Sequence, residues 1–257
     1  MDRSLRQKFL IWVFLIFIPI KTLGLDAFEI QVYDSNINDV GVFILENHVN
    51  YVISGLTSPD YTGQLPNNHL IHWTYEFARG MTPSWELGAY LQTATTLNPQ
   101  VYYAGVKLRS KFAVPKKSLA DSRFQLGVNV EISNIPNTFE QSRWGGEIRP
   151  IFGYSWSRVT AIINPNLEFN FNLTNIPAFS PLMKISLDTL HGYALGLESY
   201  SGTGQINNVG SFDQQEHYLF ATFDLLGRAL ELNAGIGGGL TSSSNSAVIK
   251  TIVGFEL

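Results

Sequence analysis

The stretch Leu-Ile-His-Trp-Thr-Tyr-Glu-Phe-Ala-Arg, residues 70–79, alternates between apolar and polar side chains. Ile71, Trp73, Tyr75 and Phe77 fall on one face of an extended chain. A second alternating run, residues 85–94, follows after a four-residue turn at 80–83 that contains glycine and proline. Alternation with a period of two is typical of a β-strand, and two such runs joined by a turn predict a β-hairpin.

The same alternation recurs from residue 41 to the last residue, 257, and the runs add up to about twelve strands. Long connections at 55–66, 134–141, 173–181, 201–214 and 241–246 alternate with short turns at 80–83, 157, 191 and 227–228. Two connections depart from this alternation of long and short. The connection 97–100 is short where a long one is expected, and 115–122 is long where a short one is expected. In residues 216–226 and 229–240 the alternation is too weak to assign faces. An even strand number places both ends of the barrel sequence on the same side.

Composition distinguishes a membrane barrel from a soluble sandwich. The chain is 45% hydrophobic but only 15% charged, against about 25% charged residues in soluble domains. The polar face of the strands is rich in Gly, Asn, Ser, Thr and Gln, where a soluble sheet would carry many lysines and glutamates. No run in the body of the chain reaches the roughly 18 apolar residues of a spanning helix. These features predict an all-β fold, a closed antiparallel transmembrane β-barrel of about 12 strands with long outer loops and short periplasmic turns.

Aromatic side chains gather near the predicted strand ends, as expected of the two girdles at the membrane interfaces. The residues assigned to the girdles are Tyr51, Trp73, Phe77, Trp85, Trp144, Trp156, Tyr193 and Phe255.

The first 24 residues have the layout of a secretory signal peptide. Basic residues between 3 and 8 precede the apolar run 9–20, and small residues at 22 and 24 fit a cleavage site. Cleavage after Gly24 is preferred over cleavage after Ala27, and the run is short for a membrane anchor. We therefore expect a signal peptide at 1–24, a periplasmic or plug segment at 25–40 and the barrel at 41–257. Residues 27–34 are also a possible thirteenth strand.

The chain contains no cysteine, which excludes disulfides, thiolate metal sites and a lipid-modified cysteine. Together with the export signal, this composition suits the periplasm or the outer membrane, and the barrel pattern favours the outer membrane of a Gram-negative bacterium. The net charge of −4 argues against a nucleic-acid partner. The expected surroundings are outer-membrane lipid, and no cofactor or metal is expected.

The final residues, 251–257, alternate up to an apolar Leu257 with Phe255 two positions earlier. This resembles the C-terminal assembly signal of bacterial outer-membrane proteins, although the usual last residue is Phe. It implies recognition by the barrel-assembly machinery. Segments 27–34, 196–200 and 215–220 also resemble a proteobacterial family of uncharacterised outer-membrane β-barrels. That resemblance implies a fold and a location, and it brings no catalytic residues with it.

Charged residues on the polar face define the predicted lumen. The lumen-lining candidates are Glu46, His48, His72, Glu76, Glu86, Lys107, Arg109, Lys111, Glu131, Arg143, Glu147, Arg149 and Glu168. Acids dominate the early strands and bases the middle strands. A cross-lumen ion-pair network is favoured over a water-filled path, because unpaired charges in a low-dielectric interior are costly.

The sequence leaves three alternative functions open. The first is a narrow pore for small solutes, in which Lys107, Arg109, Arg143 and Arg149 face Glu46, Glu76 and Glu86 across the path. The second is a plugged barrel with a structural or adhesive role.

The third alternative, ranked lowest, is a membrane-embedded lipid hydrolase. The sequence contains no soluble-enzyme motif, and the glycine-rich run 235–239 lacks the lysine of a phosphate loop. His48, His72 and Glu76 are more simply explained by lumen hydrogen bonds than by a metal or catalytic site. A lipid hydrolase needs an outward serine–histidine pair, and the nearest histidine, His217, lies in a run of uncertain parity. The sequence therefore predicts no enzyme and no catalytic residues.

Overall fold

A computed structural model of the protein describes residues 25–98, 100–226 and 230–257. The predicted signal peptide and the predicted turn at 227–228 lie outside these residues. The long strands are β1 (Phe43–Ser54), β2 (Leu70–Thr82), β3 (Trp85–Thr96), β4 (Val101–Ala113), β5 (Phe124–Asn134), β6 (Trp144–Trp156), β7 (Val159–Asn170), β8 (Thr174–Asp188), β9 (Tyr193–Gly202), β12 (Glu216–Leu225), β13 (Glu231–Gly239) and β14 (Ala247–Glu256).

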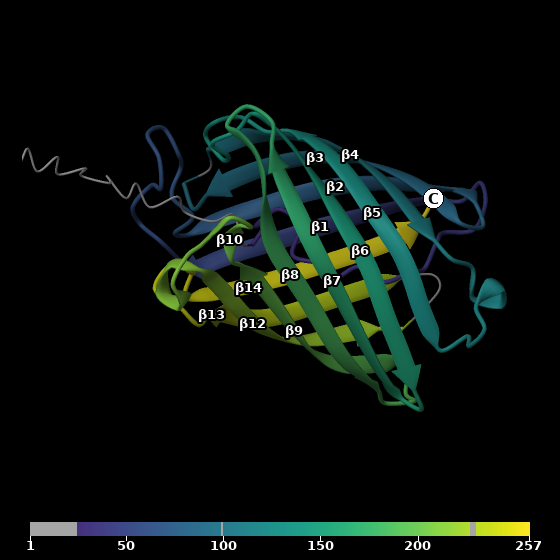
Figure 1. The fold of residues 1–257 in the computed structure, drawn as a ribbon. Coiled ribbons are helices and arrows are strands. Elements are labelled where there is room, and N and C mark those ends of the chain that lie inside the picture. The colour runs from purple at the N-terminus through teal and green to yellow at the C-terminus, as the bar shows by residue number, and fades with distance from the viewer. Residues whose placement is uncertain (1–24, 99, 227–229) are drawn as a thin grey trace, which may run out of the picture.

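These twelve strands form one closed antiparallel barrel (Figure 1). Each strand pairs with its neighbours in the chain, β9 pairs with both β8 and β12, and β1 pairs with β14 to close the sheet. The pairing of Leu45 with Phe255 belongs to this closing seam. Closure leaves no unpaired sheet edge to be exposed in lipid. The predicted twelve-stranded barrel is therefore confirmed.

The two ends of the barrel differ in the length of their connections. One end, which we call the turn end, carries the short turns 83–84, 157–158 and 189–192, together with the start of β1 and the end of β14. The other, the loop end, carries the connections 55–69, 135–143, 203–215 and 240–246. The two predicted exceptions persist, because 97–100 is a short connection at the loop end and 114–123 a long one at the turn end.

Short elements decorate the connections. The loop between β9 and β12 contains β10 (Gly204–Gln205), β11 (Asn208–Val209) and the 3-10 helix η2 (Phe212–Gln214), and the connection 114–123 contains η1 (Lys116–Ser118). No helix in the described part of the chain is both long and apolar enough to span a membrane.

A bulge at Gly105 reverses the predicted faces at the start of β4. Gln92 pairs with Gly105 but Thr93 pairs with Tyr103, so one extra residue is inserted. As a result Ala104 is buried and Tyr103 is exposed, whereas alternation counted back from the outward Val106 predicts Tyr102 and Ala104 on the outer face. Gly105 has φ of 120°, and a Cβ there would lie 2.5 Å from the Asn134 carbonyl oxygen. Only glycine fits both conditions, and alternation alone cannot detect such a bulge.

The predicted loop 173–181 is also wrong, because β8 already begins at Thr174. The strand contains two prolines, Pro177 and Pro181, which are rare inside a sheet. In the barrel Pro181 lies opposite Pro165 of β7, so the two residues that lack an N–H face each other.

Candidate functional site

Residues 25–38 occupy the lumen of the barrel in an irregular conformation, and no strand forms there. A lumen segment of this kind cannot pair its backbone in a sheet, so side chains of the wall satisfy it. Asn164 of β7 donates to the Tyr33 carbonyl at 3.0 Å and accepts from the Tyr33 N–H at 2.8 Å. Asn50, Thr74 and Lys250 donate to the carbonyls of residues 27, 28 and 30 at 2.9, 2.9 and 3.1 Å. Four different strands therefore hold the segment in place.

Glu29 is the charged centre of this segment and is only 2% exposed. Its carboxylate lies 3.2 Å from the Lys107 ammonium and 3.4 Å from the Arg149 guanidinium. Tyr33 donates its hydroxyl to Glu29 at 2.8 Å and lies 2.6 Å from the hydroxyl of Tyr90. The Arg149 guanidinium also lies over the Tyr33 ring, 4.7 Å from its centroid. A buried carboxylate with two cations and a hydroxyl is well compensated, so Glu29 anchors the lumen segment to β4 and β6.

The wall beside this anchor carries a second set of ion pairs on β2, β3 and β4. Arg109 contacts Glu76, and its other terminal nitrogen lies 2.8 Å from Glu86. Lys111 lies 3.3 Å from the same Glu86. Glu86 pairs from β3 with the neighbouring β4, and Glu76 pairs with Arg109 from β2, one strand further along the same wall. These acids and bases therefore do not face each other across an open path. The ion pairs thus form a network along one wall, where the sequence favoured a network across the lumen.

A third set of ion pairs joins β8, β9, β12 and β14 on the other side of the lumen. Lys184 lies 3.0 Å from Glu198 and 2.7 Å from Asp224. Lys250 also contacts Glu198, which accepts a hydrogen bond of 2.5 Å from the Tyr200 hydroxyl. Sequence reasoning could not place Asp224, because the alternation in β12 is irregular.

The predicted lumen residues fall into three groups. The buried ones on the wall are His48, His72, Glu76, Glu86, Lys107, Arg109, Lys111, Glu131 and Arg149. Glu46, Glu147 and Glu168 are half-buried and line the cavities described below. The prediction that Arg143 lines the lumen is wrong, because Arg143 is exposed in the connection before β6 and lies outside the lumen. The alternation breaks down where that connection meets the strand.

The predicted girdle residues lie near both ends of the barrel wall. Tyr51, Trp73 and Trp144 are near the loop end, and Phe77, Trp85, Trp156, Tyr193 and Phe255 are near the turn end. Several stack on outward neighbours, such as Trp85 on Phe112 with ring centroids 6.0 Å apart.

Glu46, His48 and Glu76 place their ligand atoms within 4.8 Å of one another, which is compatible with a metal ion. The His48 Nε2 atom lies 3.2 Å from Glu76 and 3.4 Å from Glu46. Arg109 contacts the same Glu76 and already supplies positive charge there. His72 does not join this group, because its ring packs edge-on against Phe28 at 4.7 Å. The cluster is therefore better explained as part of the ion-pair network.

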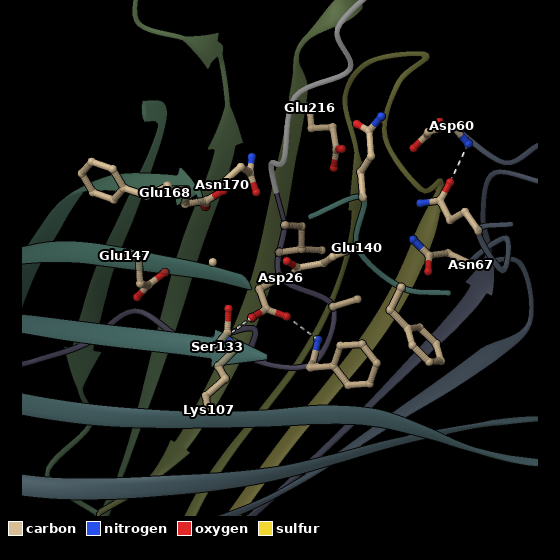
Figure 2. Close-up of a pocket in the computed structure, with 18 of the residues that line it drawn as sticks. Asp26, Asp60, Asn67, Lys107, Ser133, Glu140, Glu147, Glu168, Asn170 and Glu216 are labelled. Carbon is tan, nitrogen blue, oxygen red and sulfur yellow. Dashed lines mark hydrogen bonds and ion pairs between the residues drawn. The ribbon is translucent and has the colours of Figure 1, made fainter. Parts of the chain in front are cut away.

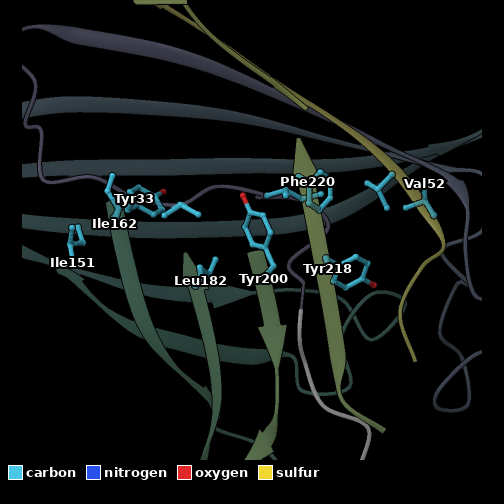
Figure 3. Close-up of a cluster of buried hydrophobic side chains, with 11 residues drawn as sticks. Tyr33, Val52, Ile151, Ile162, Leu182, Tyr200, Tyr218 and Phe220 are labelled. Atoms are coloured by element: carbon cyan, nitrogen blue, oxygen red, sulfur yellow. The ribbon is translucent and has the colours of Figure 1, made fainter. Parts of the chain in front are cut away.

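Part of the lumen is apolar, which the sequence did not predict. Ile30 and Val32 of the lumen segment pack in one cluster with inward residues of the wall, among them Ile151, Phe220 and Val248 (Figure 3). These wall residues face a piece of protein where an open barrel would face water. These inward positions are apolar, where the alternation predicts polar residues, because they pack against the apolar side chains of the lumen segment.

Two cavities remain, one on each side of the blocked middle. The loop-end cavity, of about 410 Å³, is lined by Leu25, Asp26, Phe28 and the loop-end halves of the strands. The turn-end cavity, of about 680 Å³, is lined by residues 31–34, Asn36 and Asn38. The same lumen segment thus contributes to both, and its residues 29 and 30 lie between them.

The loop-end cavity is acidic (Figure 2). Asp26, Glu140, Glu147 and Glu168 point into it, and Glu131 also lines it. Lys107 is the only lysine or arginine among the described residues of the lining. Glu140 comes from the connection 135–143, outside the strands. Burial, followed by the nearby charge of Asp26, raises the pKa of the Glu140 carboxyl to about 7. The cavity therefore gains negative charge as the pH rises through neutrality.

The barrel is similar to solved outer-membrane channels. It matches an outer-membrane channel of Pseudomonas putida F1 with a TM-score of 0.60 and 11% identity over 89% of this chain and 100% of that one. It matches the NanC porin with a TM-score of 0.55 and 8% identity over 84% of this chain and 100% of that one. At such identities the likeness shows the fold alone. No family model and no curated protein matches the chain, so membership of a proteobacterial family stays a prediction.

Proposed function

We propose that this protein is an outer-membrane channel for small solutes that is closed by its own N-terminal segment. The observation that carries the proposal is the position of residues 25–38, which separate an acidic cavity at one end of the lumen from a second cavity at the other. The barrel wall is continuous, and the segment that blocks the middle of the lumen is not part of that wall. Moving that piece would join the two cavities into one path.

The membrane placement rests on the outer surface of the barrel. Large apolar side chains such as Leu108, Met183 and Leu195 are more than half exposed on the outward faces of the strands. A soluble protein rarely exposes so extended an apolar surface. Short turns face the periplasm in barrels of this class, so we assign the loop end to the cell exterior.

The contacts of the lumen segment are suited to a gate. They include hydrogen bonds and ion pairs, for which water can substitute when the segment moves, together with apolar contacts of Phe28, Ile30 and Val32. The acidic cavity would be the first part of the path that a solute meets from the exterior. Its excess of carboxylates favours cationic over anionic solutes.

The second candidate is a barrel that stays plugged and has a structural role. The near-complete burial of Glu29 favours it, because withdrawing a paired charge from such a site is costly. The two functions differ in one measurable property, which is whether the native chain can open at all.

Planar-bilayer recording of the folded chain distinguishes them. The chain contains no cysteine, so the pair Ala27→Cys and Asn50→Cys gives a specific reversible crosslink between the segment and β1. We expect no conductance steps while the crosslink is oxidised and discrete steps after reduction, with each single-cysteine variant as a control. Glu29→Gln removes the central charge and is expected to raise the open probability at least about tenfold, which corresponds to about 1.4 kcal/mol.

A silent bilayer would contradict the channel. If the reduced pair and Glu29→Gln both stay silent while their gel mobility shows a folded barrel, the permanently plugged barrel replaces this proposal.

A further inference from the structure

A serine, a histidine and a glutamine meet on the outer wall of the barrel, away from the lumen. Burial alternates along β9 and β12, with Tyr200, Tyr218 and Phe220 buried inside. Ser201 and His217 have the opposite parity and face outward, and they are paired with each other across the two strands. This settles the face of His217, which the sequence left open.

The backbone of His217 brings the two side chains close. Its N–H donates to the Ser244 hydroxyl at 2.9 Å, and its carbonyl accepts from the Leu240 N–H at 2.7 Å, so both groups point away from β9. His217 and Ser201 therefore form a pair without backbone hydrogen bonds between them, the kind in which side chains lie closest. The Ser201 hydroxyl lies 2.9 Å from the His217 Nδ1 atom.

Gln215 fixes the tautomer of the neutral imidazole. The Gln215 amide nitrogen donates to the Gly210 carbonyl at 2.7 Å, because a carbonyl only accepts. Its amide oxygen must then be the atom 3.0 Å from the His217 Nε2 atom. Neutral His217 donates from Nε2 to this oxygen and leaves Nδ1 bare, as a base that accepts the hydroxyl proton of Ser201.

The loop between β9 and β12 holds this arrangement rigid. The Gln215 N–H bonds to the carbonyls of residues 211 and 212, and its carbonyl accepts from the Thr241 hydroxyl at 2.7 Å. Phe212 stacks on the His217 ring with centroids 4.7 Å apart and planes at 16°. A base oriented by a third group and bonded to a hydroxyl is the defining arrangement of an activated serine nucleophile.

The surroundings of the pair indicate the substrate. The next outward residues toward the middle of the wall are Leu219 on β12 and Met183 on β8, and both are exposed. Phe212 and Leu240 are exposed at the rim beside the pair. Ser201 lies where the lipid-facing surface meets the loop end. A serine there would meet the acyl esters of lipids, whose carbonyl groups lie at the boundary between the acyl chains and the headgroups.

We propose that Ser201, His217 and Gln215 form a catalytic site that hydrolyses acyl esters of lipids in the leaflet at the loop end. The Ser201 oxygen attacks the ester carbonyl carbon while its proton passes to His217 Nδ1. The ester C–O bond breaks, the alcohol leaves with the proton from His217, and an acyl-serine remains. Water then attacks the acyl-serine with His217 as base, releasing a fatty acid and restoring the serine.

The site is independent of the lumen. It shares with the proposed channel only the membrane placement, so a silent bilayer leaves the hydrolase intact and an inactive hydrolase leaves the channel intact.

A fluorophosphonate probe and fatty-acid release from phosphatidylethanolamine mixed micelles test the site on the full folded chain. We expect the probe to label Ser201, located by peptide mass spectrometry. Ser201→Ala is expected to abolish both signals, and His217→Asn to lower hydrolysis by about 10²–10⁴-fold. Ser199→Ala is the matched control, because Ser199 is the preceding outward residue of β9 and lies opposite Leu219. It should leave hydrolysis unchanged.

Gln215 is a positioning residue, and its test is a pH profile. Gln215→Leu should lower kcat with little change in KM. Gln215→Glu should restore an acceptor for Nε2 and move the acidic limb of the profile to higher pH, because a carboxylate favours the protonated imidazole. Folded protein that neither reacts with the probe nor releases fatty acid would overturn the proposal. Hydrolysis at the native rate in Ser201→Ala or in His217→Asn would also overturn it.

Discussion

At the scale of single residues, Glu140 is the clearest point of pH sensitivity. The pKa of its carboxyl is raised from 4.5 to about 7 in the folded protein, mainly by burial. Between these values the folded chain holds a proton that the unfolded chain has released. Stability should therefore fall as the pH rises from about 4.5 to 7 and then level off, by up to about 3 kcal/mol from this group.

Glu140→Gln removes this titration. We expect the variant to match the native protein below pH 4.5 and to be more stable above pH 7, measured by urea unfolding in detergent across that range. An equal stability difference at every pH would show that Glu140 does not titrate in this interval.

Two residues show how far a sequence can predict such positions. Trp73 and Phe77 were assigned to the outer face by alternation alone, and both are exposed there. The face of Ala104 was assigned wrongly, because the deciding feature is the left-handed backbone of Gly105 one position later. From the sequence alone, a glycine in a regular strand cannot be distinguished from a glycine in a bulge.

At the scale of elements, Glu198 links strands that are not neighbours in the sheet. It lies on β9 and contacts Lys184 of the adjacent β8 and Lys250 of β14, which is separated from β9 by β12 and β13. Its removal leaves two ammonium groups close together without their shared partner. Removal of Lys250 leaves Glu198 still paired with Lys184.

Glu198→Gln should consequently destabilise the barrel by about 3–5 kcal/mol, and Lys250→Met by clearly less. Urea unfolding measures both, and the double variant closes a mutant cycle. The exposed pair of Asp121 and Arg123 is the control, since Asp121→Asn should cause no measurable change. Equal costs for the two lumen variants would contradict a role for Glu198 as the shared partner.

The strands themselves were predictable where they face lipid on one side and polar groups on the other. β8 begins at Thr174, within the stretch predicted as a loop, and β12 was left without faces because Tyr218 and Phe220 point inward. The inward position of these aromatic residues is explained by their packing against the apolar part of the lumen segment. The candidate site on the outer wall was missed for the same reason, because the face of His217 depends on the face of Tyr218.

At the scale of the whole molecule, the barrel should behave as a membrane protein with a closed sheet. We expect it in the outer-membrane fraction, with a circular dichroism spectrum dominated by strand and with faster gel mobility before boiling than after. The continuous sheet resists detergent until heat opens it. Recovery from the soluble periplasm, or an unchanged mobility on boiling, would contradict this expectation.

The closing seam between β1 and β14 also has a consequence for the order of assembly. The lumen segment is continuous with β1, and its side chains interlock with β4, β6 and β7 inside the finished barrel. If the segment lies against the open sheet before β1 and β14 pair, Tyr33 reaches its place between Arg149 and Asn164 without being threaded through a closed barrel. We therefore expect seam formation to be a late step of folding.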